Sequence, residues 1–400
     1  MVRGFGGTPQ DWGTEEISDG AWMFWWLYFV DPPEKPENFD VYSRPLIVWL
    51  DGGPGDGGSG NGNFLQIGPL EIDGVTHRNT TWVKDYHVLF IDAPVGAGFS
   101  YVSDASKYRR EDDDIASDIH VCLKKFFHKH KEFQSVPMYI VGHSYGAKLA
   151  VKLAELLIDS AESLPNNLKG VGLSSPFISP VDTALSLGEY HHKLGFLDDA
   201  QRLVIEDVAR TLEADVEEEN WIEAFWDNMN VSQNLVGYTT FWNLENVSVK
   251  SRPRLHSELN ETQVDGFMNS EVKQVLGIAT NYGERFRDVY ISLNRTFIKS
   301  AISSVKKLVE KPGVKVVVFA GQMDGIVPHI STEAWVNRIF QKDEEWLLAS
   351  RNPLLIDGAI EGFEKHHKSF SMYWILRAGH LVTRDNPKAV EVILNRLTNE

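Results

Sequence analysis

The feature that most restricts the fold of this chain is a serine between two glycines, placed where a strand-like run changes to a helix-like one. Residues 138–141 are apolar, Gly142-His143-Ser144-Tyr145-Gly146 follows, and apolar side chains then recur at helical spacing. A strand, a tight turn and a helix in this order predict a nucleophile elbow, which lifts the serine hydroxyl off a sheet. Because five-residue patterns also occur by chance, the alternative is an ordinary strand–helix junction with a buried serine.

Strand-like and helix-like segments alternate in the first and last parts of the chain, which predicts an α/β fold with a doubly wound, mostly parallel sheet. Charged and polar residues dominate between about 180 and 302. We therefore expect a core at 1–180 and 303–400, with a mostly helical cap or insertion at 181–302 over the carboxyl edge of the sheet. A separate helical domain without contact to the site is the alternative. The expected strands are 22–30, 46–50, 87–92, 138–141, 171–173, 314–319 and 370–376, and the expected helices are 112–131, 145–162 and 388–397.

Two polar residues follow strands in the second part of the chain. Asp324 comes just after the strand expected at 314–319, and His380 just after the one at 370–376. A serine hydroxyl needs an adjacent base to become a nucleophile, and the base needs a carboxylate to orient it. In this fold the three residues follow in the order serine, acid, histidine. We therefore expect Ser144 to be the nucleophile of a serine hydrolase, His380 its general base and acid, and Asp324 the orienting acid.

The densest glycine cluster, residues 51–62, directly follows the strand expected at 46–50. Its glycines formally match a dinucleotide fingerprint, but no early βαβ unit frames them, and the Gly-Lys-Ser/Thr of a phosphate loop is absent. Upstream of an elbow, the backbone N–H groups of such a loop can point at an oxyanion. The expected oxyanion hole consists of the backbone N–H groups of Gly53 and Tyr145.

Composition and spacing exclude several classes of function. A formal net charge of −17 leaves no basic surface for nucleic acid. The apolar run at 21–30 is too short to span a bilayer. The rival histidines lack the spacing of zinc ligands and are expected to be solvated, so no metal and no other cofactor is expected. These rivals are His128, His130, His191, His192, His366 and His367. The single cysteine, Cys122, has helical core spacing and is expected to be buried rather than reactive.

Signals for the cellular compartment conflict. The first eleven residues lack the apolar segment of a signal peptide, and one cysteine permits no intramolecular disulfide, which favours an intracellular location. Five N-glycosylation sequons instead favour the secretory route. With the acidic composition, they lead us to expect a secreted, lysosomal or vesicular protein. Its assembly is left open between a monomer and a homodimer. The sequon asparagines are Asn79, Asn230, Asn246, Asn260 and Asn294.

Beyond the elbow, four strings fall in the order typical of one family: 45–50 leading into Gly-Gly-Pro-Gly, 92–101, 321–324 and 378–382. Over nearly its whole length the chain resembles the serine carboxypeptidases, which have the α/β-hydrolase fold. The strings at 22–28, 130–134, 178–182 and 373–376 resemble the retinoid-inducible branch of that family. The resemblance implies removal of C-terminal residues from peptides or proteins in an acidic setting, without a cofactor.

The resemblance also implies a clamp for the terminal carboxylate of the substrate, made by Asp51, Gly52, Gln66 and His143. The family usually has Asn or Gln in place of Asp51, and Glu in place of both Gln66 and His143. The family's glutamates must be protonated to bind, which accounts for its preference for acid. Here Gln66 would donate at any pH, and His143, if charged, would attract the carboxylate. Asp51 would repel it unless protonated or paired with His143.

These departures predict a carboxypeptidase with altered pH dependence or specificity. Thr383-Arg384 also replaces the usual Pro-containing sequence after His380, which affects the expected pocket for the leaving residue. Two alternatives remain open: an acyltransferase or esterase that uses the same triad, and a non-catalytic family member that only binds peptides.

Overall fold

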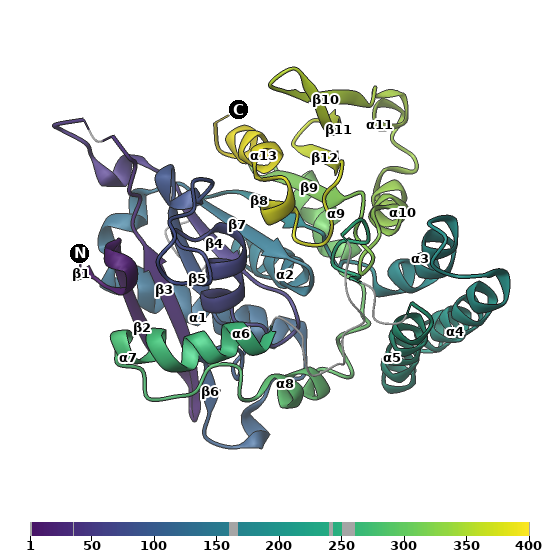
Figure 1. Cartoon of the computed structure of the whole chain (residues 1–400), viewed down its shortest axis with the longest axis horizontal. Helices are drawn as coiled ribbons and strands as arrows, with labels where there is room; N and C mark the ends of the chain where they lie inside the picture. The colour runs from purple at the N-terminus through teal and green to yellow at the C-terminus, as the bar shows by residue number, and fades with distance from the viewer. Residues whose placement is uncertain (1, 35, 160–166, 240–242, 250–260, 400) are drawn as a thin grey trace.

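The computed structural model describes residues 2–34, 36–159, 167–239, 243–249 and 261–399. The strands are β1 (Val2–Arg3), β2 (Pro9–Ser18), β3 (Ala21–Tyr28), β4 (Leu46–Leu50), β5 (His87–Ile91), β6 (Tyr101–Val102), β7 (Met138–His143), β8 (Leu168–Ser174), β9 (Lys315–Gly321), β10 (Asn352–Ile356), β11 (Ala359–His367) and β12 (Phe370–Ile375). They form a single sheet in the order β1-β2-β3-β5-β4-β7-β8-β9-β12-β11-β10, with β6 paired to β3 (Figure 1).

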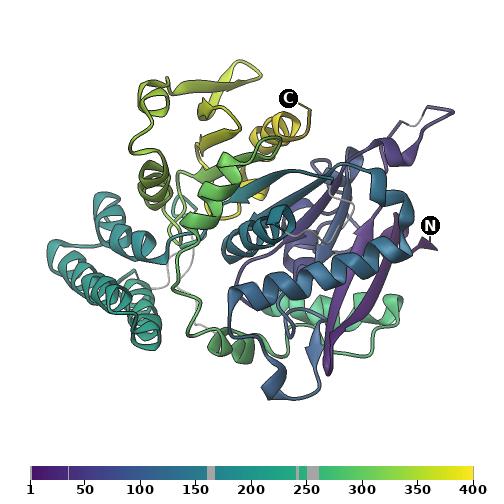
Figure 2. The ribbon, with the colours of Figure 1, turned by 180° about the vertical axis from the view of Figure 1, so that it is seen from behind.

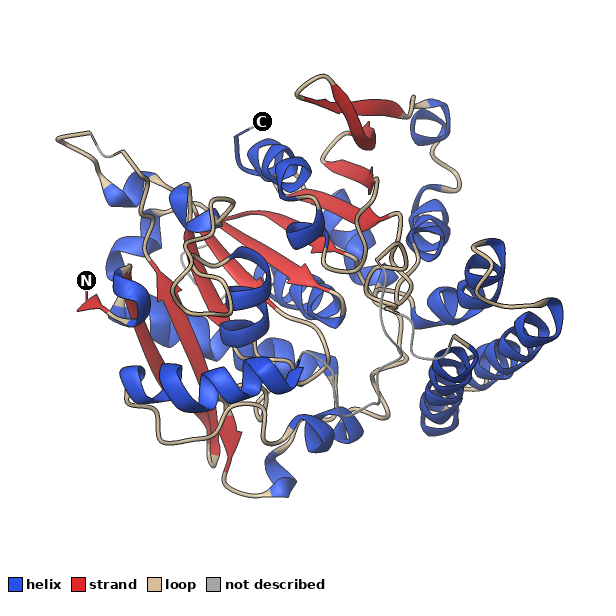
Figure 3. Ribbon diagram, in the orientation of Figure 1, coloured by secondary structure: helices blue, strands red, loops and turns tan. Residues whose placement is uncertain are grey.

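Helices cover both faces of this sheet (Figures 1 and 3). The α-helices are α1 (Asp112–Lys129), α2 (Tyr145–Asp159), α3 (Pro180–Lys193), α4 (Asp199–Glu217), α5 (Trp221–Tyr238), α6 (Glu261–Phe267), α7 (Lys273–Leu276), α8 (Phe286–Ser292), α9 (Ile302–Glu310), α10 (His329–Phe340), α11 (Glu344–Leu348), α12 (Val382–Asp385) and α13 (Pro387–Asn399). Short 3-10 or π turns are η1 (Phe5–Gly7), η2 (Val41–Ser43), η3 (Gly58–Ile67), η4 (Trp82–Lys84), η5 (Ala105–Lys107), η6 (Lys131–Ser135) and η8 (Met268–Val272). The expected extension of α2 to residue 162 lies outside the described residues.

The six central strands, from β5 across to β12, are parallel, whereas the strands at both edges are antiparallel. This arrangement confirms the predicted α/β fold with a mostly parallel sheet. The edge strands β2, β10 and β11 were not predicted. Their side chains are mostly half-exposed or exposed, so they lack the continuous apolar run of a strand buried on both faces.

Alternate residues of β3 supply the two cores on opposite faces of the sheet. Trp25 and Leu27 belong to the core that also contains the apolar residues of α1 and α2, which lie across the near face in Figure 2. Trp26 and Tyr28 belong to the other core, with residues of η3 and α13. Successive side chains of a strand point to opposite faces, so a strand covered on both sides is apolar throughout.

The register of the parallel strands brings three loops to one edge. His143, the last residue of β7, pairs with Ser174 at the end of β8, and Gly321 at the end of β9 pairs with Ile375 at the end of β12. The loops after β7, β9 and β12 therefore leave the sheet at the same carboxyl edge. In open α/β sheets this edge is where ligands bind.

The chain between β8 and β9 adds α3 to α9 and, among the described residues, no strand. Helices α3, α4 and α5 pack on one another beside the sheet, whereas α6 lies across the face opposite α1, against η3 (Figures 1 and 2). Among the residues described, no helix combines the length and the apolar character needed to cross a membrane.

Candidate active site

Ser144 occupies the turn between β7 and α2 with a backbone φ of +55°. Residues with a side chain seldom adopt this left-handed region, and doing so costs about 1–3 kcal/mol. The turn is held by hydrogen bonds from the N–H of Ser144 to the carbonyl of Ser174 (2.9 Å) and from the N–H of Phe177 to the carbonyl of Ser144 (3.1 Å). A strained serine between a strand and a helix is the geometry of a nucleophile elbow.

Both glycines of the elbow permit a close backbone approach. A Cβ on Gly142 would clash with the backbone of Gly146, and a Cβ on Gly146 would lie 2.5 Å from the carbonyl oxygen of Asp51. The glycine-rich loop also touches the serine, because a Cβ on Gly52 would lie 2.9 Å from Cβ of Ser144 and 3.4 Å from its Oγ. The elbow and the glycine-rich loop therefore form one site.

Asp324 and His380 form a buried pair. Nδ1 of His380 lies 2.7 Å from Oδ2 of Asp324, whose Oδ1 accepts hydrogen bonds from the N–H groups of Ile326 and Val327, each at 2.9 Å. Burial lowers the pKa of His380, but the charge of Asp324 and the hydrogen bond to it outweigh this effect, and the net pKa is raised. With Nδ1 bonded to the carboxylate, Nε2 is the atom that can take a proton from a hydroxyl.

His143 brings the elbow next to this pair. Its ring centroid lies 4.7 Å from that of His380, and its other neighbour is Trp49 of β4, at 6.3 Å with the rings nearly parallel. Because His143 directly precedes Ser144, the nucleophile's turn lies beside the candidate base. The structure thus brings Ser144, Asp324 and His380 to one edge of the sheet, and their catalytic roles stay predictions.

The two backbone groups predicted for the oxyanion hole flank the serine. Tyr145 is the first residue of α2, where a backbone N–H has no partner within the helix. Gly53 has a φ of +102°, and a Cβ there would lie 2.7 Å from the nitrogen of Gly55. This loop conformation therefore requires glycine at position 53.

Asp51 is buried and hydrogen bonded within its own loop. Its Oδ1 accepts from the N–H of Gly52 at 2.9 Å, and its Oδ2 from the indole of Trp49 at 3.2 Å. Burial raises the pKa of Asp51 to about 6, and these two bonds oppose the rise. Of the two conditions under which Asp51 would not repel a carboxylate, these bonds to Trp49 and Gly52 leave protonation rather than pairing with His143. As a result, the Gly52 N–H predicted to bind a substrate carboxylate already holds the carboxylate of Asp51.

The other two predicted clamp residues, Gln66 and His143, are also buried. Oε1 of Gln66 accepts from the hydroxyl of Thr383 at 2.7 Å, which leaves Nε2 as the donor for a ligand. Burial lowers the pKa of His143 well below its ordinary value, and the charges of His380 and Arg384 act in the same direction. Burial therefore disfavours the charged form of His143 that would attract a carboxylate, and its buried Nδ1 lacks a partner among the described residues.

Sequence reasoning noted Thr383 as a departure from the family but missed its hydrogen bond to Gln66. The available signal was its replacement of the Pro-containing sequence usual after the histidine in the family. Two of the rival histidines expected to be solvated, His191 and His367, are buried. Nδ1 of His191 lies 2.9 Å from the carbonyl of Leu187 in the preceding turn of α3. The sequence of α3 is polar, and its helical periodicity alone does not show that this helix packs against the loop after β9.

Within the described part of the chain, one group has the spacing of metal ligands: Asp343, Glu345 and His367. Lys368 lies near both carboxylates, with Nζ 3.8 Å from Asp343 and 3.5 Å from Glu345. His367 pairs with the first residue of β12, so the group lies at the amino edge of the sheet. It takes no part in the site at the carboxyl edge.

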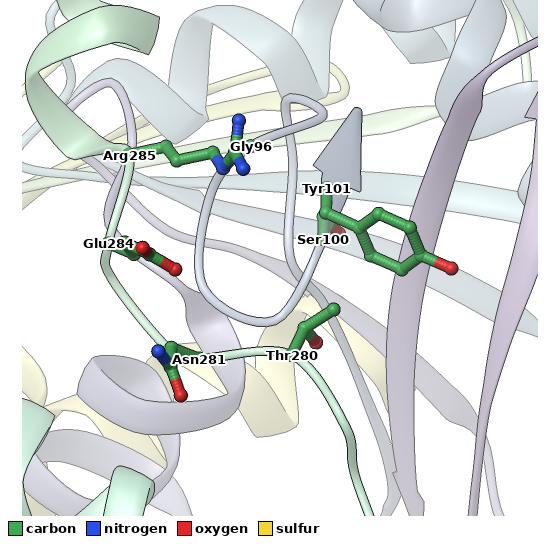
Figure 4. A pocket seen from close by; sticks show the side chains of 7 residues that line it. All are labelled: Gly96, Ser100, Tyr101, Thr280, Asn281, Glu284 and Arg285. Atoms are coloured by element: carbon green, nitrogen blue, oxygen red, sulfur yellow. The ribbon is translucent and has the colours of Figure 1, made fainter. Parts of the chain in front are cut away.

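A small polar pocket of about 90 Å³ lies elsewhere, between the loop after β5 and the segment before α8 (Figure 4). Its volume is below the roughly 300 Å³ of a typical ligand site, and no predicted catalytic or clamp residue lines it. The lining residues are Gly96, Ser100, Tyr101, Thr280, Asn281, Glu284 and Arg285.

Comparisons with known proteins agree with this geometry. The family model described as serine carboxypeptidase matches residues 9–400. Retinoid-inducible serine carboxypeptidase of Mus musculus is 34% identical over 424 residues, which cover 97% of this chain and 91% of that protein. Serine carboxypeptidase-like 51 of Arabidopsis thaliana is 33% identical over 430 residues, with 97% and 91% covered.

Solved structures show the same fold. The crystal structure of Kex1Δp, a prohormone-processing carboxypeptidase from Saccharomyces cerevisiae, superposes with a TM-score of 0.83 over 98% of this chain and 92% of that one, at 20% identity. At this identity the likeness speaks for the fold alone. Together, the fold and the match along almost the entire sequence place this chain in the serine carboxypeptidase family of serine-type exopeptidases, with the α/β-hydrolase fold.

Proposed function

We propose that this protein removes C-terminal residues from peptides or proteins through an acyl-enzyme formed on Ser144. The observation that carries the proposal is the buried hydrogen bond between His380 and Asp324, 2.7 Å long, beside a serine held at a positive φ. A strained backbone combined with a neighbouring histidine–carboxylate pair is what a serine nucleophile requires.

In this mechanism Nε2 of His380 takes the proton of the Ser144 hydroxyl as Oγ attacks the scissile carbonyl. The N–H groups of Gly53 and Tyr145 donate to the oxyanion of the tetrahedral intermediate. His380 then protonates the leaving amine, and a water molecule activated by the same imidazole releases the acyl group. Asp324 holds the imidazole in the tautomer that these steps require.

We further propose that the clamp binds the substrate's terminal carboxylate together with a proton. A protonated Asp51 donates a hydrogen bond to the carboxylate, whereas an ionised Asp51 repels it. Neutral His143 is bonded to the backbone of Ser174, so its Nδ1 is an acceptor until it is protonated. Gln66 donates at any pH. The preference for acid implied by the family would thus be retained in substrate binding, through different groups.

A secreted or lysosomal location follows from the same proposal. The clamp binds best where Asp51 is protonated, and a net charge of −17 is reduced in an acidic compartment as carboxylates gain protons.

The test compares a peptide with its C-terminal amide, for the wild type and for Ser144→Ala. We expect the wild type to release the C-terminal residue of the free acid much faster than that of the amide, and Ser144→Ala to lose about 10⁴-fold or more in kcat. A fluorophosphonate probe should label the wild type alone.

Other results would favour the alternatives. Equal rates on acid and amide would contradict the exopeptidase proposal. Acyl transfer to an added alcohol or amine without net hydrolysis would identify an acyltransferase. Absence of labelling between pH 4 and 8, a range that brackets the ordinary histidine pKa of about 6.5, would identify a non-catalytic binder.

A further inference from the structure

Residues 244–247, from the chain that follows α5, lie between the two loops that carry the candidate acid and base; we call them the bridging segment. On the acid side, the N–H of Gly325 donates to the carbonyl of the first residue, Leu244, at 2.9 Å. The N–H of the last residue, Val247, donates to the carbonyl of Met323 at 3.0 Å. The segment therefore binds the residues on both sides of the candidate acid.

On the base side, the N–H of His380 donates to the carbonyl of Glu245. Nδ2 of Asn246 donates to Oδ2 of Asp385 at 2.8 Å, and the N–H of Gly379 donates to the same oxygen at 2.8 Å. Asn246 thus reaches the residue before the candidate base through a shared carboxylate. Hydrogen bonds to charged groups are stronger than neutral ones, which makes this the firmest link between the segment and the base loop.

Packing reinforces these bonds. A Cβ on Gly325 would lie 2.7 Å from Cγ1 of Val247, and a Cβ on Gly379 would lie 2.6 Å from Cβ of Asn246. Real Cβ atoms do not approach other atoms so closely, so each loop has glycine at the point where the segment crosses it. Any shift of the segment would have to move one of the two loops.

Asn246 is also one of the five sequon asparagines, but its side chain is fully engaged. Its Oδ1 accepts from the N–H of Ser248 at 3.1 Å and from the Ser248 hydroxyl at 2.6 Å. Its Nδ2 is bonded to Asp385, and the residue is 3% exposed. In the folded protein this amide nitrogen has no room for a glycan. The side chain of Asn246 is instead used for hydrogen bonds inside the protein.

We propose that Asn246 is a positioning residue for the reaction: by tying the bridging segment to the base loop, it fixes the spacing of Asp324 and His380. The inference rests on the proposed function and goes beyond it. The bridging segment belongs to the long chain between β8 and β9. If the proposal holds, this chain helps to align the triad and does not only cover the sheet.

The first test is Asn246→Ala with a peptide substrate. Loss of the bond to Asp385 lets His380 depart from its productive orientation, while the clamp residues keep their contacts. We expect kcat to fall about 10- to 100-fold and KM to stay within about twofold, a pattern that marks an interaction made in the transition state.

Ser248→Ala is the matched control. Both substitutions abolish the same sequon, but Ser248→Ala leaves the bond from Asn246 to Asp385 in place, and the Ser248 N–H still orients the amide. We expect kcat of Ser248→Ala within about twofold of the wild type. An equal loss in the two variants would overturn the inference.

Asn246→Asp adds a second measurement, the pH dependence of activity, which a general loss of stability would not reproduce. It puts a carboxylate against Asp385, whose other oxygen lies 3.3 Å from Nε of Arg384; Arg384 in turn lies 3.6 Å from Glu245. Two carboxylates in contact share a proton as the pH falls, and the introduced carboxyl group, once protonated, would again donate to Asp385. The ratio of Asn246→Asp activity to wild-type activity should therefore rise severalfold from pH 7 to pH 5.

Fluorophosphonate labelling of the wild type separates the two proposals. A wild type that labels, with Asn246→Ala labelling slowly, supports both. A wild type that labels no faster than Asn246→Ala overturns the role of Asn246 alone, as does an Asn246→Asp ratio that is flat with pH. A wild type that does not label overturns the proposed function and this inference with it.

Discussion

At the scale of single residues, Asp51 distinguishes this site. Its carboxylate accepts the N–H of Gly52, the group that the proposed clamp offers to the carboxylate of a substrate. Protonation weakens that internal bond and turns Asp51 from a competitor into a donor. In the proposed clamp, the protonation state of this one buried side chain would therefore decide whether the substrate carboxylate is attracted or repelled.

This argument predicts a pH-dependent KM. Because burial raises the pKa of Asp51 to about 6, the protonated form falls from about nine-tenths at pH 5 to about one-tenth at pH 7. The KM for a peptide with a free C-terminus should rise about tenfold over this range. In Asp51→Asn, which carries no charge at any pH, we expect a rise of about twofold or less. The measurement is the pH profile of KM for both proteins.

The C-terminal amide of the same peptide is the control for this prediction. It has no carboxylate to repel, so its KM should not change with the ionisation of Asp51. An equally steep rise for the amide, or an unchanged rise in Asp51→Asn, would exclude Asp51 as the titrating group. The fall of kcat at low pH is expected to come from protonation of His380, whose net pKa is raised. It is measured from kcat and is therefore distinguished from the change in KM.

At the scale of elements, a buried ion pair joins the elbow helix to α1. Nζ of Lys148 on α2 lies 2.8 Å from Oδ2 of Asp112 on α1 and donates to the carbonyls of Thr296 and Phe297 at 2.8 and 3.1 Å. The hydroxyl of Tyr145 donates to the same aspartate. Tyr145, whose backbone N–H is proposed for the oxyanion hole, is thus held through its side chain by the ion pair between α1 and α2.

We predict that Lys148→Met lowers the free energy of unfolding by about 3–5 kcal/mol, because it leaves the buried carboxylate of Asp112 uncompensated. Adding Asp112→Asn should recover part of this loss. Lys152→Met, one turn later on α2, removes an ion pair with the exposed Asp113 and should cost about 0–1 kcal/mol. Urea unfolding of the three variants measures the difference, and equal costs for the two lysines would argue against a structural role of the buried pair.

The elements that build the sheet edge were predictable from sequence. The strand before the elbow and those before Asp324 and His380 are apolar because they are buried on both faces, and each precedes a chemically distinctive residue. Periodicity and order along the chain are enough to place such residues at one edge.

The rest was not predictable, for physical reasons. Several bonds of the bridging segment are made by backbone groups, which leave no trace in residue type. Asn246 and the glycines at 325 and 379 are constrained by contacts with residues far away in the chain, which a local sequence pattern does not reveal. The state of His143 depends on burial and on the charges of His380 and Arg384. Both are set by the tertiary fold rather than by the neighbours of His143 in the chain.

At the scale of the whole molecule, the sequons acquire different meanings once the fold is known. Asn79 is exposed in the loop before η4, and Asn230 is exposed on α5. Asn294 is half-buried, and Asn246 is buried and bonded. Asn260 lies outside the described residues. Accessibility therefore divides a motif that the sequence presents as five equivalent sites.

If the protein follows the secretory route, as the proposed function requires, Asn79 should carry a glycan and Asn246 should not. The wild type expressed in a secretory host would be treated with peptide N-glycosidase, which converts a glycosylated asparagine to aspartate, and its peptides analysed by mass spectrometry. We expect conversion at Asn79 and none at Asn246, with Asn79→Gln as the control for assignment. Conversion at Asn246 would mean that its amide is accessible during folding and is then missing from the bridging contact. Absence of conversion at Asn79 would contradict the use predicted for this exposed sequon.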